Sequence, residues 1–177
     1  MDALMLINTH ESAVPTEPLI QLLGKARMAD GVIAYVTAPA EESAFAEPVE
    51  GAAPAEESAF AEPVEGAAPV AAEPTADDLI LASPTPDAYE SYDDLALGLQ
   101  DMGIERLIVA GADSAPDAEG RGAVWATAAA ALAHQFSVVF VESAVVLPST
   151  GDRPAWMHDA FQLGAVEKPA EDIWLKM

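Results

Sequence analysis

Residues 107–143, LIVAGADSAPDAEGRGAVWATAAAALAHQFSVVFVES, decide the fold of this chain. An apolar run is followed by a turn rich in Gly, Asp and Pro, an Ala-rich segment, and a second apolar run rich in Val. This pattern predicts a strand, a turn, a helix that packs closely on a sheet, and another strand. In an α/β enzyme, a nucleophile or a phosphate site would lie in the turn after such a strand. Here the helix opens on GAVW, residues 122–125, which offers no side chain that can attack a substrate.

The alternation of strands and helices continues on both sides of this stretch. The apolar patterns predict strands at 3–8, 32–37, 78–82, 106–110 and 138–141, and a last strand at 165–167 or 173–175. They predict helices at 17–28, 91–102, 123–134 and 152–163. We therefore expect a single domain over residues 1–177 with a three-layer α/β/α fold and a mostly parallel sheet of about six strands.

A tandem repeat interrupts the pattern. Residues 38–52 and 53–67 both read APAEESAFAEPVEGA, and a third copy begins at residue 68 and then decays. The Pro, Glu and Ala content of the repeat gives no continuous apolar face. The composition predicts an acidic loop over residues 38–76, inserted between the second and third strands. A docking motif around Phe45 and Phe60 is the alternative.

The composition excludes several classes of function. The chain has no cysteine, which rules out disulfides, zinc–thiolate sites and a cysteine nucleophile. The net charge of −23 makes nucleic acids and anionic membranes poor partners. No apolar run is long enough for membrane insertion, so we expect a cytoplasmic protein. The acidity fits a solvated acidic loop or, alternatively, a surface adapted to a high-salt cytoplasm.

Three stretches resemble the isochorismatase-like cysteine hydrolases, which include nicotinamidases and N-carbamoylsarcosine amidases. They are residues 2–10, DALMLINTH; residues 78–89, DLILASPTPDAY; and residues 102–146, from MGIERLIVAGADS to VVFVESAVV. The resemblance covers roughly residues 1–37 and 77–177. It implies a sheet of strand order 3-2-1-4-5-6 with its site at the carboxyl ends of the strands.

The resemblance also implies where the family's catalytic Asp, Lys and Cys would lie. These positions are Asn8, Ser83 and Ala123, which provide no base, no charge and no nucleophile. We therefore predict that the chain is not an enzyme. The predicted role is that of a catalytically inactive pseudoenzyme with a structural or protein-interaction function, as a subunit of an oligomer or with a protein partner. No cofactor and no metal are expected, because His10, His134 and His158 are widely separated in the sequence.

The alternative function is that of a small-molecule binding protein, or of a hydrolase with a rebuilt site that uses no cysteine. The candidate ligand pocket consists of Asn8, His10, Ser83, Asp113, Ser114 and Ala123. In a rebuilt site, Ser83, Ser114 or Ser143 would be the nucleophile, His10 the base and Asp113 the residue that orients the base. Against this, Ser and Asp at strand ends usually cap helices or form turns, and the G-x-S-x-G motif of a serine hydrolase is absent. The tryptophans that would anchor a protein partner are Trp125, Trp156 and Trp174.

Overall fold

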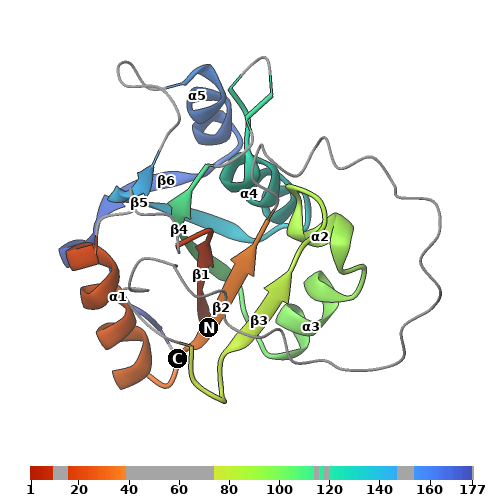
Figure 1. The fold of residues 1–177 in the computed structure, drawn as a ribbon. Helices are drawn as coiled ribbons and strands as arrows, with labels where there is room; N and C mark the ends of the chain where they lie inside the picture. The colour runs from red at the N-terminus through yellow and green to blue at the C-terminus, as the bar shows by residue number, and fades with distance from the viewer. Residues whose placement is uncertain (10–15, 39–73, 114–115, 118–119, 147–153, 177) are drawn as a thin grey trace, which may run out of the picture.

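A computed structural model describes residues 1–9, 16–38, 74–113, 116–117, 120–146 and 154–176 (Figure 1). In this part of the chain, six parallel strands form one sheet of order β3-β2-β1-β4-β5-β6. The strands are β1 (Asp2–Ile7), β2 (Val32–Thr37), β3 (Leu79–Ala82), β4 (Arg106–Ala112), β5 (Ser137–Val146) and β6 (Val166–Pro169). The predicted fold class and strand order are confirmed.

Helices cover both faces of the sheet. They are α1 (Thr16–Met28), α2 (Ala88–Ser91), α3 (Leu95–Asp101), α4 (Ala123–Ala133), α5 (Ala155–Gln162) and the short 3-10 helix η2 (Ala170–Asp172). One group of buried apolar side chains lies between the sheet and α2, α3, α4 and α5, and a second lies between the sheet and α1 with η2. Figure 1 shows α1 on the opposite side of the strands from α3 and α4. The molecule therefore has three layers, as the sequence predicts.

The central strands are apolar on both sides because both faces are covered. All six residues of β1 are buried. Ala3, Met5 and Ile7 belong to one apolar cluster, while Leu4 and Leu6 belong to the other. This alternation explains why β1 reads as a continuous apolar run rather than as an alternating one.

The structure corrects three predicted boundaries. The helix expected at 91–102 begins only at Leu95, as α3, and its first predicted residue, Ser91, is instead the last residue of the separate short helix α2. Asp87 begins α2 by accepting from the backbone N–H of Tyr89, and the interruption before α3 lies where the backbone leaves the helical region at Tyr92, whose φ is −135°. Strand β5 continues to Val146, beyond the predicted end at 141, because the end of β4 pairs with it again after a register shift. The last strand is Val166–Pro169, which overlaps the 165–167 alternative and excludes the one at 173–175.

Gly111 brings the ends of β1 and β4 into close contact. Its φ of +132° lies in a region that L side chains rarely adopt, and a Cβ added to it would lie 1.8 Å from the carbonyl oxygen of Ile7. Ile7 and Gly111 are partners in the sheet. Only glycine fits this position, because the two central strands approach each other so closely there.

The predicted acidic loop, residues 38–76, lies almost entirely outside the described residues. Strands β2 and β3, which flank it, are adjacent and parallel. Its character as a loop inserted in a single domain therefore stays a prediction. None of the described helices is long and apolar enough to cross a membrane.

Candidate functional site

Most of the buried polar side chains described in the structure gather at one end of the molecule. Asn8, Ser83 and Asp113 follow the carboxyl ends of β1, β3 and β4, and Thr127 lies in the second turn of α4. Strands β1 and β4 are neighbours from which the strand order runs in opposite directions, to β2 and β3 on one side and to β5 and β6 on the other. In open parallel sheets, ligands bind outside the carboxyl ends of the strands at such a switch point. Asn8 and Asp113 follow the two strands that form it.

Asn8 fixes the end of β1 against the end of β2. Its backbone N–H donates to the carbonyl of Val36 at 2.8 Å, and its side-chain Oδ1 accepts from the backbone N–H of Ala38 at 2.8 Å. The backbone of Asn8 has a φ of 49°, a left-handed conformation that asparagine tolerates better than most residues. The structure thus places Asn8 at the predicted end of the sheet, where it contributes a buried, neutral amide.

Asp113 caps helix α4 from the end of β4. Its Oδ1 accepts from the backbone N–H groups of Val124 at 2.8 Å and Trp125 at 3.1 Å, and its Oδ2 accepts from that of Gly122 at 3.3 Å. The N-cap residue Gly122 has no side chain of its own, so Asp113 takes its place. Burial raises the pKa of Asp113 to about 6, although the three N–H groups act in the opposite direction. This carboxyl group can therefore exchange a proton close to neutral pH.

Ser83 belongs to a network within the loop before α2. Its hydroxyl donates to the carbonyl of Thr85 at 2.5 Å and lies 2.6 Å from the hydroxyl of Ser91. A serine nucleophile needs a base that can accept the proton of its hydroxyl. A carbonyl oxygen and a second hydroxyl are not such bases, so the geometry favours a turn-forming role for Ser83.

Thr127 is a buried residue of this region that the sequence analysis did not select. Its Oγ1 donates to the carbonyl of Pro86 at 3.3 Å and accepts from the backbone N–H of Ala88 at 3.3 Å, which joins α4 to the start of α2. Its position in the sequence could have indicated it, because Thr127 follows the candidate residue Ala123 by about one helical turn and therefore lies on the same face of α4. Ala123 is buried as the first residue of α4, where it provides packing and no reactive group.

Three other candidate residues lie wholly or partly outside the part of the chain that the structure describes. His10 and Ser114 lie outside the described residues, and of the side chain of Ser143 nothing is described. Of the residues proposed for a rebuilt site, the structure therefore describes the side chains of Ser83 and Asp113. Their hydrogen bonds go to different parts of the fold, those of Ser83 to the region of α2 and those of Asp113 to α4. Asp113, predicted to orient a histidine, instead binds the first turn of α4.

The three tryptophans occupy different environments. Trp156 is buried, donates from Nε1 to the carbonyl of Gly120 at 2.9 Å, and has its ring centroid 5.5 Å from that of Trp125. These two residues contribute to the packing of α4 and α5. Trp174 is 76% exposed and is the only one of the three whose ring faces solvent to this extent.

Comparisons with known proteins identify the fold. No family model and no curated protein matches the sequence. Among solved structures, an isochorismatase family protein from Desulfovibrio vulgaris is 21% identical, with a TM-score of 0.69, and the match covers 96% of this chain and 94% of that one. N-carbamoylsarcosine amidase from Thermoplasma acidophilum is 19% identical, with a TM-score of 0.66 and coverages of 97% and 98%. Pyrazinamidase of Pyrococcus horikoshii in complex with zinc is 20% identical, with a TM-score of 0.62 and coverages of 95% and 98%.

The structure of that pyrazinamidase holds zinc, which raises the question of a metal site among the described residues of this chain. Within the described ranges, no group of three His, Cys, Asp or Glu side chains could hold a metal ion. The described residues therefore do not fit a metal site.

These neighbours contradict the prediction that the chain is not an enzyme. Structures that share the fold over nearly their whole length are named as amidases, so this fold gives no ground for predicting inactivity. The prediction was wrong because it equated the absence of one catalytic set with the absence of catalysis. The sequence has no cysteine to act as a nucleophile, but Asp113 provides a titratable group at the carboxyl end of the sheet. The chain has the fold of the isochorismatase-like hydrolases.

Proposed function

We propose that this protein is a hydrolase of small amides that works without a cysteine, with Asp113 as its general acid and base. The observation that carries the proposal is a buried carboxyl group at the switch point of the sheet, with a pKa raised to about 6. The names of the amidases that share the fold support the choice of an amide as substrate.

The chemistry follows from the protonation state of Asp113. Near pH 7 a carboxyl group with this pKa is mostly ionised, so it can accept a proton from a water molecule while the water oxygen attacks the amide carbonyl. The protonated carboxyl then donates that proton to the nitrogen as the carbon–nitrogen bond breaks. The products are a carboxylic acid and ammonia or an amine, and Asp113 returns to its starting state.

The surroundings of Asp113 suit this role. Three backbone N–H groups of the α4 N-terminus hold the carboxyl group in one orientation, so little reorganisation is needed when it ionises. Asn8 lies one strand away and presents a neutral amide rather than a second carboxylate. A second carboxylate there would compete for the same proton.

The proposal favours Asp113 over Ser83 because of their partners. The described hydrogen bonds of the Ser83 hydroxyl involve carbonyl oxygens and other hydroxyls, which cannot activate it. The water mechanism requires no nucleophilic side chain. Self-association or binding to a protein partner stays a prediction, and the amide-hydrolase proposal does not depend on it.

The test uses the purified chain with N-carbamoylsarcosine, pyrazinamide and nicotinamide, followed by ammonia release. Asp113→Asn should lower kcat/KM at least about 100-fold for any amide that the chain hydrolyses, because it removes the acid and base. Asp117→Asn is the matched control. Asp117 forms an exposed pair with Arg121 at 2.8 Å, and its charge is the smallest of the causes that act on the pKa of Asp113. Above about pH 7, where Asp113 is ionised with or without that charge, this variant should stay within about twofold of the parent.

Two results would contradict the proposal. One is the absence of hydrolysis of all three amides by the purified chain. The other is hydrolysis that survives Asp113→Asn while the variant keeps its fold, as judged by circular dichroism.

A further inference from the structure

The few basic residues of this chain are concentrated beside the amino end of β4. Of its seven Lys and Arg residues, Arg106, Lys168 and Lys176 line a single cavity of about 280 Å³. The other lining residues are Ile108, Val139, Asp172, Ile173 and Trp174. We propose that this cavity binds a small organic anion, a carboxylate or phosphate attached to an apolar group. It lies at the opposite end of β4 from Asp113 and is independent of the proposed hydrolase site.

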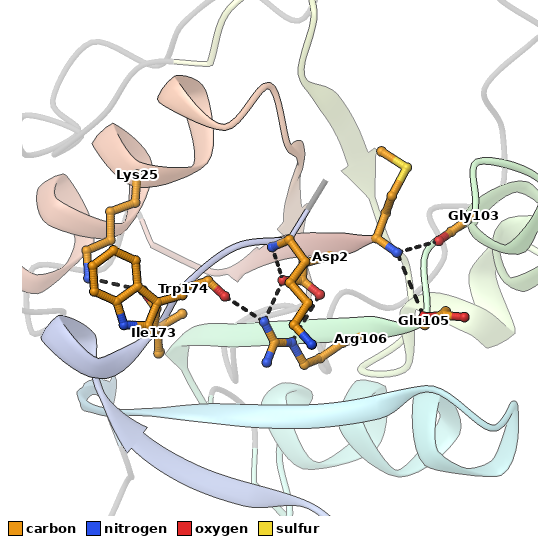
Figure 2. A network of polar contacts seen from close by, with 9 residues as sticks. Asp2, Lys25, Gly103, Glu105, Arg106, Ile173 and Trp174 are labelled. Atoms are coloured by element: carbon orange, nitrogen blue, oxygen red, sulfur yellow. Dashed lines mark hydrogen bonds and ion pairs between the residues drawn. The ribbon is translucent and has the colours of Figure 1, made fainter.

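Arg106 is held rigidly at the cavity. Its Nε and Nη2 donate to the two carboxylate oxygens of Asp2 at 3.0 and 2.5 Å, and Nη2 also donates to the carbonyl of Trp174 at 2.6 Å. Figure 2 shows the guanidinium group between the Asp2 side chain and the Trp174 carbonyl. No described atom accepts from its Nη1, so two N–H groups of an oriented guanidinium stay available to a ligand.

The C-terminal segment that closes the cavity is also fixed in place. Lys25 of α1 donates from Nζ to the carbonyls of Ala170, Glu171 and Ile173 at 2.7, 2.9 and 3.1 Å. The same Nζ lies 5.5 Å from the ring centroid of Trp174, as a cation–π contact. Figure 2 shows Lys25 against this ring. The cavity wall is therefore a built part of the fold rather than a chance gap between side chains.

Lys168 and Lys176 add two exposed positive charges to the cavity. Both residues are exposed, and neither ammonium group forms an ion pair with a described residue. The backbone N–H of Lys176 donates to Asp2 at 2.5 Å, which anchors this residue beside Arg106. Two flexible cations next to one fixed guanidinium make a suitable set of donors for an anionic group.

The charge balance favours an anion over other ligands. Three basic side chains and one acidic side chain line the cavity, and the charge of Asp2 offsets that of Arg106. A net positive charge remains, on a chain whose overall charge is −23. The net negative charge of the chain repels anions, so a ligand of this sign would find a favourable site at this positively charged cavity.

The size and lining of the cavity define the remainder of the ligand. Its volume of about 280 Å³ corresponds to a small molecule. Ile108, Val139 and Ile173 provide apolar contacts, and the exposed ring of Trp174 offers a face on which a planar group can stack.

Benzoate and phenyl phosphate are suitable probes, with benzyl alcohol as the neutral control. Titration followed by calorimetry and by tryptophan fluorescence should show saturable binding of one or both anions and a much weaker response to the alcohol. Lys168→Gln and Lys176→Gln should each weaken binding by about three- to tenfold, since each removes a charged contact to the ligand. Arg27→Gln changes the net charge equally but alters a pair with Asp78 outside the cavity, so its affinity should match the parent.

The same titration separates this site from the proposed hydrolase site. Asp113→Asn should leave the affinity for both anions unchanged. The proposal is overturned if neither anion saturates by about 10 mM, a weak limit for a ligand of this size. It is also overturned if Arg27→Gln weakens binding as much as the two lysine variants do, or if benzyl alcohol binds as tightly as benzoate.

Discussion

One carboxyl group is buried at each end of the central strands, and the groups that compensate for its burial differ between the two ends. Asp2 at the amino end of β1 and Asp113 beyond the carboxyl end of β4 are 3% and 2% exposed. Asp2 faces the guanidinium of Arg106, a full positive charge. The described hydrogen-bond donors to Asp113 are all backbone N–H groups, and the nearby charge of Asp117 has the same sign as that of Asp113. Partial charges compensate for burial less completely than a full charge does, so burial prevails and raises the pKa of Asp113 to about 6.

Because of this difference, Asp2 has a structural role and Asp113 is available for proton transfer. The ion pair at the amino end joins the first strand to β4 and to the C-terminal segment, which are distant in sequence. The carboxyl group at the other end can gain and lose a proton near pH 6. The same residue type therefore stabilises the sheet at one end and is available for proton transfer at the other.

Gly111→Ala should have the largest effect on the carboxyl end. Its new methyl group would lie 1.8 Å from the carbonyl oxygen of Ile7, so β1 and β4 would have to separate. We expect a loss of at least about 4 kcal/mol in the free energy of unfolding, or failure to fold. Gly98→Ala is the control, because nothing lies within 4 Å of its added Cβ and it should gain up to about 1 kcal/mol. Equal stability of the two variants in urea unfolding would show that the strands do not approach as closely as described.

Arg106→Gln should have the next largest effect, at the amino end. It leaves the buried carboxylate of Asp2 without its cation, which should cost about 3 kcal/mol. The double variant Asp2→Asn with Arg106→Gln should lose less than the sum of the two single variants, because the charge that Arg106 compensates is then absent. Additive losses in a double-mutant cycle would show that the pair does not couple.

Asp113→Asn should change how stability depends on pH. An aspartate in an unfolded chain has a pKa near 4, whereas that of Asp113 in the folded chain is about 6. Between these values the folded state binds the proton more tightly, so the stability contributed by this group falls as the pH rises from about 4 to about 6 and remains low above that range. Urea unfolding across this range should show a loss in the parent that exceeds the loss in the variant by up to about 3 kcal/mol. Identical pH dependence in the two proteins would remove the case for a perturbed carboxyl group.

Much of the fold could be predicted from the sequence because the signals are local. Continuous apolar runs predict buried parallel strands, and the Ala-rich segment predicts α4 close to the sheet. The division at Tyr92 could not be predicted from apolar spacing, since Leu95 and Leu99 keep the helical spacing on either interpretation. It lies where the backbone of Tyr92 leaves the helical region between α2 and α3, which the apolar spacing does not encode.

The candidate site was predictable only in part. Sequence position alone placed Asn8, Ser83 and Asp113 after strands. The raised pKa of Asp113 depends on burial and on N–H groups contributed by residues 122–125, which no sequence pattern reveals. The pair of Asp2 with Arg106 joins residues 104 positions apart, and the grouping of Arg106 with Lys168 and Lys176 likewise appears only in the folded chain.

The pH dependence of amide hydrolysis tests the central claim most directly. With Asp113 as the base, kcat/KM should rise about tenfold per pH unit below about 6 and level off above it. Asp113→Asn should abolish this inflection together with at least about 100-fold of the rate. Asp117→Asn should keep the rate of the plateau and move the inflection to a slightly lower pH, because the charge of Asp117 adds to the raised pKa of Asp113. A profile that shows the same inflection near pH 6 in the Asp113→Asn variant would assign the titrating group to another residue and contradict the account.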